Sequence, residues 1–382
     1  MIIAGVIAEY NPFHNGHLHH LREARRKSGC DGLIVCLGGN FTQRGEPAML
    51  SKWTRARMAL LCGADAVFEL PAPFAVRTAD FFARGGVGVL AGLHCDVLSF
   101  GCETEDVKLL QTLAELRETE PGALSSLVRA RLEAGMSHAR ARGEAVAEYL
   151  GLPAEKLNAP NMALAVEYLR CLRGTETKPL VVPRVGDYHA AALAPICSAT
   201  AVRKALINGE DVSGSVPEAC LPLLPEKPRL PLDAVFLYRL RQGGLSLPDA
   251  GEGLDGLLTR TARESGTLEE VIERVKSRRY TRARIVRAMA HAAAGLTKEV
   301  AAACQRPAYA RLLGLRAGAE GVLRELSRRA ALPIVSDATR LRGDTCFEAE
   351  QRFTDLWALG APEIGKRRAG QELTRPFVRV EA

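Results

Sequence analysis

The sequence predicts an α/β protein in which a doubly wound parallel sheet is followed by a helical C-terminal domain. The first hundred residues alternate short apolar runs with helical stretches, which is typical of βαβ units in a parallel sheet. A proline-rich stretch past the middle of the chain cannot continue a helix. Beyond it the chain is rich in Ala, Leu and Arg, has no repeat of fixed period, and favours helices.

Five short apolar runs are the expected strands, and the segments between them have helical character. Ser51 is a good N-cap residue for one of these helices. The expected strands are residues 2–8, 33–37, 66–70, 97–100 and 180–183. The expected helices are 16–27, 51–62, the region 107–173 with breaks at 121 and 151–153, and a further helix from about 198.

The proline-rich stretch predicts where the chain divides. A segment with so many prolines is typical of a linker, and we place the domain boundary there. We therefore expect an α/β domain at residues 1–215, a linker at 216–231 and a helical, basic domain at 232–382.

Length and composition exclude several classes of protein. A chain of 382 residues, 47% hydrophobic and 25% charged, is neither a disordered tail, nor a collagen-like rod, nor a mini-protein. No apolar run reaches the roughly 18–20 residues that span a bilayer, so we expect no membrane partner and a cytoplasmic location. The ten cysteines form no CxxC pair and no cluster with zinc-ligand spacing, so we expect them to be reduced and to bind no metal.

The segment EYNPFHNGHLHH at 9–20 follows the first expected strand and opens a helix. Gly16 lets the backbone approach a ligand closely, and the first turn of a helix offers unpaired amides and a positive dipole end to an anion. His14 and His17 can donate hydrogen bonds to phosphate oxygens. A solvated turn would also contain such residues. We interpret the segment as a nucleotide triphosphate site at the carboxyl edge of the sheet.

A second segment, ICSATAVR at 196–203, predicts another phosphate contact. Ser198 and Thr200 place two hydroxyl groups at a helix start, and Arg203 adds a fixed positive charge one turn further on. Alone, the segment is equally typical of an ordinary capped helix. The predicted catalytic residues are His14, His17, Ser198, Thr200 and Arg203.

HNGH resembles the HxGH signature of the nucleotidylyltransferase superfamily, whose members have a Rossmann-like fold, and ICSATAVR resembles its ISSTxxR-type element. Further segments resemble the bacterial tRNA(Met) cytidine acetate ligases, and together they cover the chain to about residue 314. These segments are AEYNPFHNGH, GNFTQRG at 39–45 followed by Glu46, Pro47 and Lys52, GADAVFELP at 63–71, SFGCE at 99–103, PNMALAVEYL at 160–169, PRVGDYH at 183–189, KSRRYTRARIVR at 276–287 and YARLLG at 309–314. One departure is Cys102, where the family's FGSE-like element has a hydroxyl group.

The resemblance implies a ligase that works in two steps. ATP would activate acetate as acetyl-adenylate with release of pyrophosphate. The acetyl group would then pass to the wobble cytidine of elongator tRNA(Met), which forms acetylcytidine and releases AMP without acetyl-CoA. Attack of the carboxylate on the α-phosphorus needs no covalent enzyme intermediate. The chemistry favours Mg²⁺ on the phosphates, but the sequence identifies no ligand for it.

The resemblance also implies the residues that hold ATP. Gly101 follows an expected strand end and leaves room for a base or ribose. Asn161 offers a side-chain amide, and Arg184 can donate two hydrogen bonds to a phosphate. Each of the three would also be common as a purely structural residue. The implied ATP-binding residues are Ile7, Ala8, Glu9, Tyr10, Asn11, Pro12, Phe13, His14, Asn15, Gly16, His17, Leu18, His19, His20, Gly101, Asn161 and Arg184.

A basic segment in the C-terminal part predicts contact with tRNA. A charge run is usually a solvated face, and Glu273 could pair with part of it. On a helix from about Thr281, Ile285 and Met289 would share a buried stripe while arginines project outward to phosphates, and Tyr280 could stack on a base. The predicted tRNA-binding residues are Lys276, Arg278, Arg279, Tyr280, Arg282, Arg284 and Arg287.

Two alternatives to the ligase stay open at this point. One is a nucleotidylyltransferase that adenylates a small phosphorylated metabolite, which would leave the basic helices unexplained. The other is an RNA-binding protein with a degenerate nucleotide site, which would not split ATP.

Overall fold

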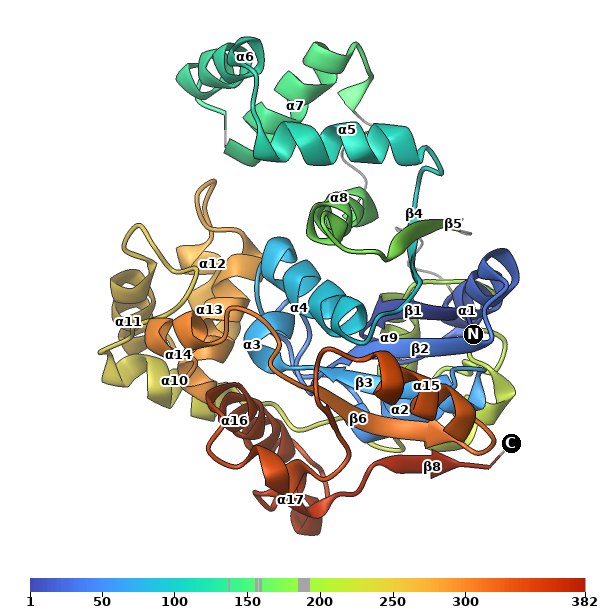
Figure 1. Cartoon of the computed structure of the whole chain (residues 1–382). Helices are drawn as coiled ribbons and strands as arrows, with labels where there is room; N and C mark the ends of the chain where they lie inside the picture. The colour runs from blue at the N-terminus through green and yellow to red at the C-terminus, as the bar shows by residue number, and fades with distance from the viewer. Residues whose placement is uncertain (137, 155–156, 158–159, 185–192, 382) are drawn as a thin grey trace.

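An eight-stranded sheet lies at the centre of the computed structural model, which describes residues 1–136, 138–154, 157, 160–184 and 193–381 (Figure 1). The strand order is β5-β4-β1-β2-β3-β6-β7, with β8 paired to β6. Strands β1 to β5 pair in parallel, and β6 runs antiparallel to β3. The strands are β1 (Ile3–Ala8), β2 (Gly32–Gly38), β3 (Ala66–Leu70), β4 (Val97–Cys102), β5 (Lys178–Pro183), β6 (Ala310–Arg316), β7 (Ile334–Val335) and β8 (Val378–Val380).

The parallel part of the sheet has the order 3-2-1-4-5 of a Rossmann-like, doubly wound fold, so the predicted fold class is confirmed. All five predicted strands are present, and β3 has the predicted bounds. These strands carry near-continuous apolar runs because helices cover both faces of the sheet. Side chains alternate along them, so that Ile34 and Cys36 enter one core while Leu33, Val35 and Leu37 enter the other.

Helices α1, α2 and α9 pack into one of these cores, and α4 and α8 pack into the other. The helices of the first half are α1 (Asn15–Ser28), α2 (Lys52–Leu61), α3 (Ala72–Ala75), α4 (Ala79–Gly92), α5 (Val107–Glu118), α6 (Gly122–Glu133), α7 (His138–Leu150), α8 (Pro160–Leu172) and α9 (Ala199–Asn208). Helices α5, α6 and α7 come between β4 and α8 in the chain, and Figure 1 shows them above α8 and the sheet.

The second half of the chain is mainly helical, as predicted. Its helices are α10 (Asp233–Gln242), α11 (Leu254–Glu264), α12 (Leu268–Val275), α13 (Arg282–Ala294), α14 (Lys298–Ala303), α15 (Glu320–Arg329), α16 (Thr345–Leu359) and α17 (Gln371–Thr374), with short 3-10 helices at η2 (Glu218–Leu223), η3 (Ala338–Leu341) and η4 (Ile364–Arg367). Among the described residues, no helix is both long and apolar enough to cross a membrane.

Strands β6, β7 and β8 were not predicted. Strand β6 returns from the helical part of the chain and pairs with β3, and β8 then pairs with β6. The run 310–316 is rich in Ala, Leu and Arg, which favour helices, so only the free edge of β3 makes it a strand.

The stretch expected to be a linker packs closely on the α/β part. Within it, η2 lies against α2, and the thiols of Cys62 and Cys220 are 3.5 Å apart. Arg229 lies over the ring of Trp357, with its guanidinium carbon 3.8 Å from the ring centroid. The division of the chain at 216–231 into separate domains stays a prediction.

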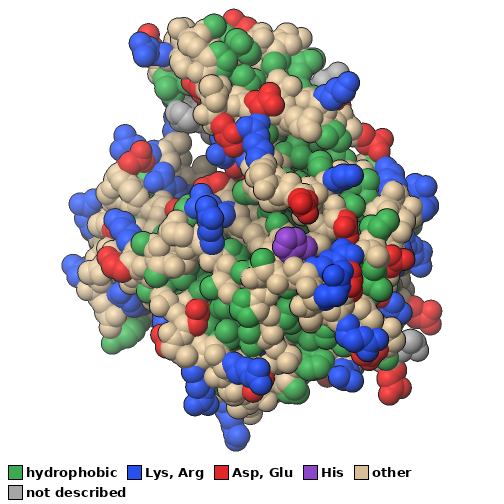
Figure 2. Space-filling model, viewed as in Figure 1, with side chains coloured by type: hydrophobic (Ala, Val, Ile, Leu, Met, Phe, Trp, Pro, Cys, Tyr) green, Lys and Arg blue, Asp and Glu red, His purple; other side chains and the backbone are tan. Residues whose placement is uncertain are grey.

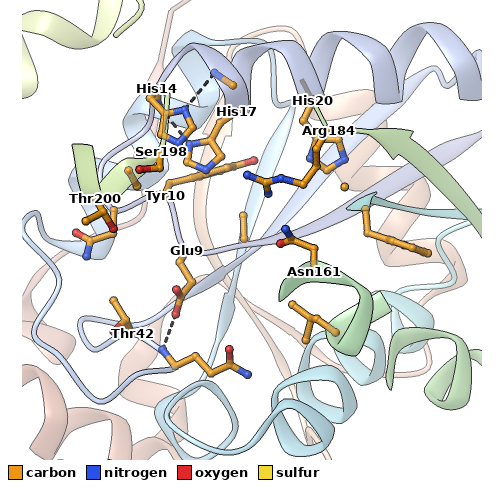
Figure 3. Close-up of a pocket in the computed structure, with 18 of the residues that line it drawn as sticks. Glu9, Tyr10, His14, His17, His20, Thr42, Asn161, Arg184, Ser198 and Thr200 are labelled. Atoms are coloured by element: carbon orange, nitrogen blue, oxygen red, sulfur yellow. Dashed lines mark hydrogen bonds between the residues drawn. The ribbon is translucent and has the colours of Figure 1, made fainter. Parts of the chain in front are cut away.

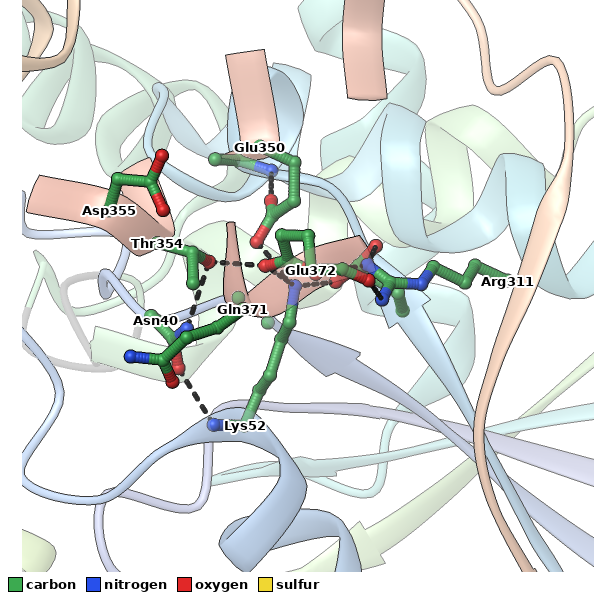
Figure 4. A network of polar contacts seen from close by, with 12 residues as sticks. Asn40, Lys52, Arg311, Glu350, Thr354, Asp355, Gln371 and Glu372 are labelled. Atoms are coloured by element: carbon green, nitrogen blue, oxygen red, sulfur yellow. Dashed lines mark hydrogen bonds and ion pairs between the residues drawn. The ribbon is translucent and has the colours of Figure 1, made fainter. Parts of the chain in front are cut away.

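A buried ionic cluster joins the two halves of the chain (Figure 4). The ammonium of Lys52 on α2 pairs with Glu69 on β3, with Glu350 on α16 at 2.8 Å and with Glu372 on α17 at 2.6 Å. Arg311 on β6 pairs with Glu69 at 3.2 Å and also with Glu372. Three carboxylates this close could hold a metal ion, but the ammonium of Lys52 already supplies the positive charge among them.

The protonation states follow from burial and from these charges. Burial alone would lower the pKa of Lys52, but the glutamates, Glu350 first, raise it above the ordinary value. Burial raises the pKa of Glu350 to about 7, against the pull of Lys52. Lys52 therefore stays charged at neutral pH.

Replacing Lys52 by Met tests how much the cluster stabilises the fold. The change leaves buried carboxylates without their cation, so we expect the free energy of unfolding, measured by urea denaturation, to fall by about 3–5 kcal/mol. Lys27→Met is the matched control, because Lys27 pairs with Glu105 at the surface. The control should change the free energy by less than about 1 kcal/mol. An equal fall in the free energy of unfolding in the two variants would show that the buried cluster stabilises the fold no more than a surface ion pair does.

Candidate active site

A cavity of about 560 Å³ opens at the carboxyl ends of β1, β4 and β5, where the strand order reverses between β1 and β4 (Figure 3). In open α/β sheets this switch point is where ligands bind. The starts of α1 and α9, part of α8 and the loop after β2 complete its wall. From the predicted set the lining includes Ile7, Ala8, Glu9, Tyr10, Asn11, His14, Gly16, His17, His19, His20, Gly101, Asn161, Arg184, Ser198, Thr200 and Arg203.

The start of α1 is built by its own histidines. His14 is the N-cap, and its Nδ1 accepts a hydrogen bond from the backbone N–H of Gly16 at 3.1 Å. The Nδ1 of His17 accepts from the backbone N–H of His14 at 3.3 Å, which completes a capping box. A Cβ at position 16 would lie 2.9 Å from Cε1 of His14, so glycine is needed there.

This capping fixes the tautomers of both rings. Because Nδ1 is the acceptor in each ring, the proton of a neutral imidazole must lie on Nε2. Burial, helped by the charge of Arg184, lowers the pKa of His14 to about 4. Burial, helped by the neighbouring His14, lowers the pKa of His17 well below its ordinary value. The two rings stack with centroids 3.7 Å apart. Each histidine is therefore a neutral Nε2–H donor on the cavity wall.

His20 links α1 to the neighbouring strand. Its Nε2 lies 3.1 Å from the hydroxyl of Ser99 on β4. Burial and then the charge of Arg184 lower the pKa of His20 to about 4, so this ring is also neutral at pH 7.

The start of α9 lies beside the start of α1. Ser198 is the N-cap of α9, and its Oγ accepts from the backbone N–H of Ala201 at 3.2 Å, which leaves the hydroxyl proton for donation. One nitrogen of Arg203 donates to the carbonyl of Asn11 at 2.7 Å, and another donates to the hydroxyl of Thr200 at 3.1 Å. The two segments that the sequence singled out therefore meet at one cavity.

Asn15 holds these segments together from behind. Its side-chain amide donates to the carbonyls of Pro195 and Gly214, each at 3.0 Å. Phe13 is fully buried in the core beneath the turn. Of the predicted ATP-binding residues, the structure leaves these four off the cavity lining: Pro12, Phe13, Asn15 and Leu18. A contact of these four residues with ATP stays a prediction.

Gly101, Asn161 and Arg184 lie on the other side of the histidines. Asn161 donates from its side-chain amide to Glu103 at 2.6 Å. The backbone N–H of Arg184 donates to the carbonyl of Cys102 at 3.1 Å, while the thiol of Cys102 is buried in the core. The departure from the family pattern at position 102 therefore lies off the cavity lining. Of the segment 183–189, residues 185–189 lie outside the described part of the chain.

The loop after β2 forms a wall of the cavity that the site prediction missed. Thr42, Gln43, Arg44 and Glu46 all line it. The segment GNFTQRG was noted only for its resemblance, because nothing in its local pattern shows that it folds back over β1. Tyr168, Leu164 and Lys204 were missed as well, since a helix periodicity does not show which residues face a cavity.

Arg55 fixes the position of this loop relative to β1. Its buried guanidinium bridges the carboxyl ends of two neighbouring strands. It donates to the carbonyl oxygens of Glu9 at 2.5 Å, Gly38 at 3.1 Å, Leu50 at 3.0 Å and Gly39. The carboxylate of Glu9 in turn accepts from the backbone N–H of Gln43 at 2.5 Å.

The basic segment forms the turn between α12 and α13 and the first turns of α13. Arg278 and Arg279 are exposed, while Lys276 pairs with Glu273 at 3.4 Å and Arg282 with Glu269 at 2.6 Å. Ile285 and Met289 are buried as predicted. Figure 2 shows Lys and Arg side chains over the lobe that contains α10 to α13, with a notch between this lobe and the upper helices.

Tyr280, Arg284 and Arg287 are partly or largely covered by other parts of the protein. The hydroxyl of Tyr280 donates to the carbonyl of Glu252 at 2.5 Å, and only 6% of the residue is exposed. The expectation that this ring is available to stack on a base is wrong, because the protein covers it. Arg284 donates to the carbonyl of Asp249 at 3.1 Å, and Arg287 is half-buried against the loop after β2, where a Cβ at Gly45 would lie 2.7 Å from its Cα.

The fold and the two helix starts that meet at one cavity indicate the class of protein. A family model described as HIGH Nucleotidyl Transferase matches residues 1–372. The histidine-led helix start after β1 and the Ser/Thr/Arg helix start of α9 are the parts of this class that the sequence predicted.

Known relatives identify the family within this class. The chain is 38% identical over 360 residues to the tRNA(Met) cytidine acetate ligase of Syntrophotalea carbinolica, which covers 89% of this chain and 86% of that one. It is 32% identical to the ligase of the same name from Acetivibrio thermocellus, and the match covers 99% of this chain and 100% of that one. The crystal structure of Thermotoga maritima TmcAL bound with alpha-thio ATP matches with a TM-score of 0.91 and 29% identity over 100% of both chains, and the apo form matches with 0.92. The chain therefore belongs to the tRNA(Met) cytidine acetate ligase family.

Substitution of His14 separates its capping role from its predicted phosphate role. His14→Asn keeps a side-chain acceptor at the N-cap, whereas His14→Ala removes it and should lower the free energy of unfolding by about 1 kcal/mol. Both variants lose the Nε2–H donor, so we expect a nonhydrolysable ATP analogue to bind roughly 10- to 100-fold more weakly by calorimetry. Wild-type affinity in His14→Asn would contradict the phosphate role.

Proposed function

We propose that this protein uses ATP to activate acetate as acetyl-adenylate and transfers the acetyl group to the wobble cytidine of elongator tRNA(Met). The observation that carries the proposal is the meeting of two helix starts, at His14–His17 and Ser198–Arg203, on one cavity at the switch point of the sheet. The full-length similarity to ligases of a single name favours this function over the two alternatives.

The triphosphate would lie against these two helix starts. Neutral imidazoles, hydroxyl groups and the unpaired N–H groups of a first helical turn are donors that suit phosphate oxygens. Arg184 and Arg203 also line the cavity and add fixed positive charge. In-line attack by the acetate oxygen on the α-phosphorus would then form acetyl-adenylate and expel pyrophosphate, and the protein would contribute orientation and charge neutralisation.

A magnesium ion does not fit a site made by these residues alone. Among the described residues that line the cavity, the carboxylates are Glu9 and Glu46, and Glu9 already accepts from the loop after β2. The predicted phosphate wall offers N–H and O–H donors, which do not ligate Mg²⁺ as carboxylates do. No step of the proposed reaction is assigned to a metal.

The anticodon loop would approach from the side of α12 and α13. The exposed Arg278 and Arg279 lie in the turn before α13, and the N-terminal half of α13 packs on the loop after β2 through Gly45. Phosphates held at this turn would place a splayed-out base close to the cavity, and a base in a loop leaves its stack at lower cost than one in a duplex.

A direct assay tests the proposed function. Purified protein is incubated with labelled acetate, ATP and either elongator tRNA(Met) or the same tRNA with uridine at the wobble position, without acetyl-CoA. We expect label on the first tRNA only, together with AMP and pyrophosphate. Pyrophosphate release that requires a phosphorylated metabolite, or tRNA retention without ATP cleavage, would contradict the proposal.

Removing two positive charges tests the proposed RNA surface. We expect Arg279→Ala/Arg282→Ala to weaken tRNA binding and to reduce the slope of log K against log salt by about 1.4–1.8, since each phosphate contact contributes about 0.7–0.9. Arg26→Ala/Arg328→Ala is the matched control, because these exposed arginines also pair with glutamates, on α1 and α15. Filter-binding titrations at several salt concentrations measure the tRNA affinity and the salt slope of each double variant. Equal slopes for the two double variants would place the RNA elsewhere.

A further inference from the structure

Glu9 is an unusual group in this cavity. The lining is rich in positive and imidazole side chains, namely Arg44, Arg184, Arg203, Lys204, His14, His17, His19 and His20. Only two carboxylates occur among the described lining residues, and they differ in setting. Glu46 is exposed at the rim, whereas Glu9 is half-buried at the end of β1.

Glu9 is held through its side chain and through its backbone. Its Oε1 accepts from the backbone N–H of Gln43 at 2.5 Å, and its own carbonyl accepts from Arg55 at 2.5 Å. The first contact commits one carboxylate oxygen to the loop after β2, so Oε2 is the oxygen suited to a ligand. Burial raises the pKa of Glu9 above its ordinary value, although the backbone N–H of Gln43 and the charges of Arg55, Arg44 and Arg203 oppose this rise.

The position of Glu9 suits the second half of the proposed reaction. Figure 3 shows Glu9 and Thr42 on the opposite side of the cavity from His14 and Ser198. The loop that holds Glu9 also packs on α13, beside the basic turn proposed to bind the anticodon loop. A base that enters from that turn would therefore meet Glu9 before it meets the predicted phosphate wall.

The acetyl transfer needs a group that can accept a proton. The lone pair of the cytosine 4-amino group is delocalised into the ring, so this nitrogen is a weak nucleophile that must lose a proton as it attacks. His14 and His17 cannot take this proton, because their Nδ1 atoms accept backbone N–H groups and their Nε2 atoms are protonated in the neutral ring. A carboxylate is also the side chain that matches the 4-amino group of cytosine as a hydrogen-bond acceptor.

We propose that Glu9 is the general base for acetyl transfer, an inference that rests on the proposed function. The 4-amino nitrogen attacks the carbonyl carbon of acetyl-adenylate, and a C–N bond forms. The bond from the carbonyl carbon to the phosphate oxygen breaks, and its electron pair leaves with AMP. The N–H proton passes to Oε2 of Glu9 and then to water.

The test measures the two half-reactions separately in Glu9→Gln. Acetate-dependent exchange of pyrophosphate into ATP reports adenylate formation, and a single-turnover chase of preformed acetyl-adenylate with tRNA reports transfer. We expect transfer to fall by about 10²- to 10⁴-fold, and exchange to fall far less, since a positioned general base contributes a factor of this size. The control is Glu363→Gln, which removes an exposed carboxylate that pairs with Lys366 and does not line the cavity. This variant should keep transfer within about threefold of wild type, because an exposed ion pair contributes little.

The pH dependence gives a second readout that a structural role would not change. Because the base must be ionised, the wild-type transfer rate should rise with pH through the raised pKa of Glu9 and then level off. Glu9→Gln should lose this rise, and Glu9→Asp should recover part of the rate with the rise intact.

Three results would overturn the inference. These are equal losses in exchange and transfer, an unchanged pH profile in Glu9→Gln, and a loss of transfer in Glu363→Gln as large as that in Glu9→Gln. Wild-type protein without acetate-dependent exchange would mark the failure of the proposed function itself. Thermal unfolding of each variant confirms that it is folded.

Discussion

The charge of Lys52, buried among three glutamates, is the constraint on which the rest of the structure depends. Glu350 and Glu372 come from the C-terminal helices, and Glu350 lies 298 positions further along the chain. Thr354 on α16 accepts from the side chain of Asn40, whose Oδ1 accepts from the backbone N–H of Lys52 at 2.7 Å. The loop that leaves β2 toward the cavity therefore starts from a point fixed by the C-terminal part of the chain.

The histidine pair combines a capping role in the fold with a proposed role in binding phosphate. The N-cap contact of a helix is a local requirement, and here imidazole nitrogens meet it in place of the usual hydroxyl or carboxylate. The same contacts decide which nitrogen carries the proton, and burial keeps both rings neutral. A neutral donor binds phosphate without the cost of holding a buried positive charge in the empty cavity.

The cavity has two walls of different character. The wall made by the starts of α1 and α9 carries donors and positive charge, and its geometry follows from short-range capping contacts. The wall made by the loop after β2 carries Glu9, which depends on Gln43 and Arg55 for its position. Helix α13 packs behind this loop, so the basic turn and the carboxylate are parts of one structural unit.

The sequence by itself determined the parallel strands and the two helix starts that follow His14 and Ser198. These features depend on local periodicity and on hydrogen bonds that span a few residues, as at His14 and Ser198. Only the tertiary structure decided that 310–316 is a strand, that Tyr280 is covered, and that Glu9 is held as a half-buried carboxylate. Each of these depends on desolvation and on partners distant in the chain, which a local pattern does not contain.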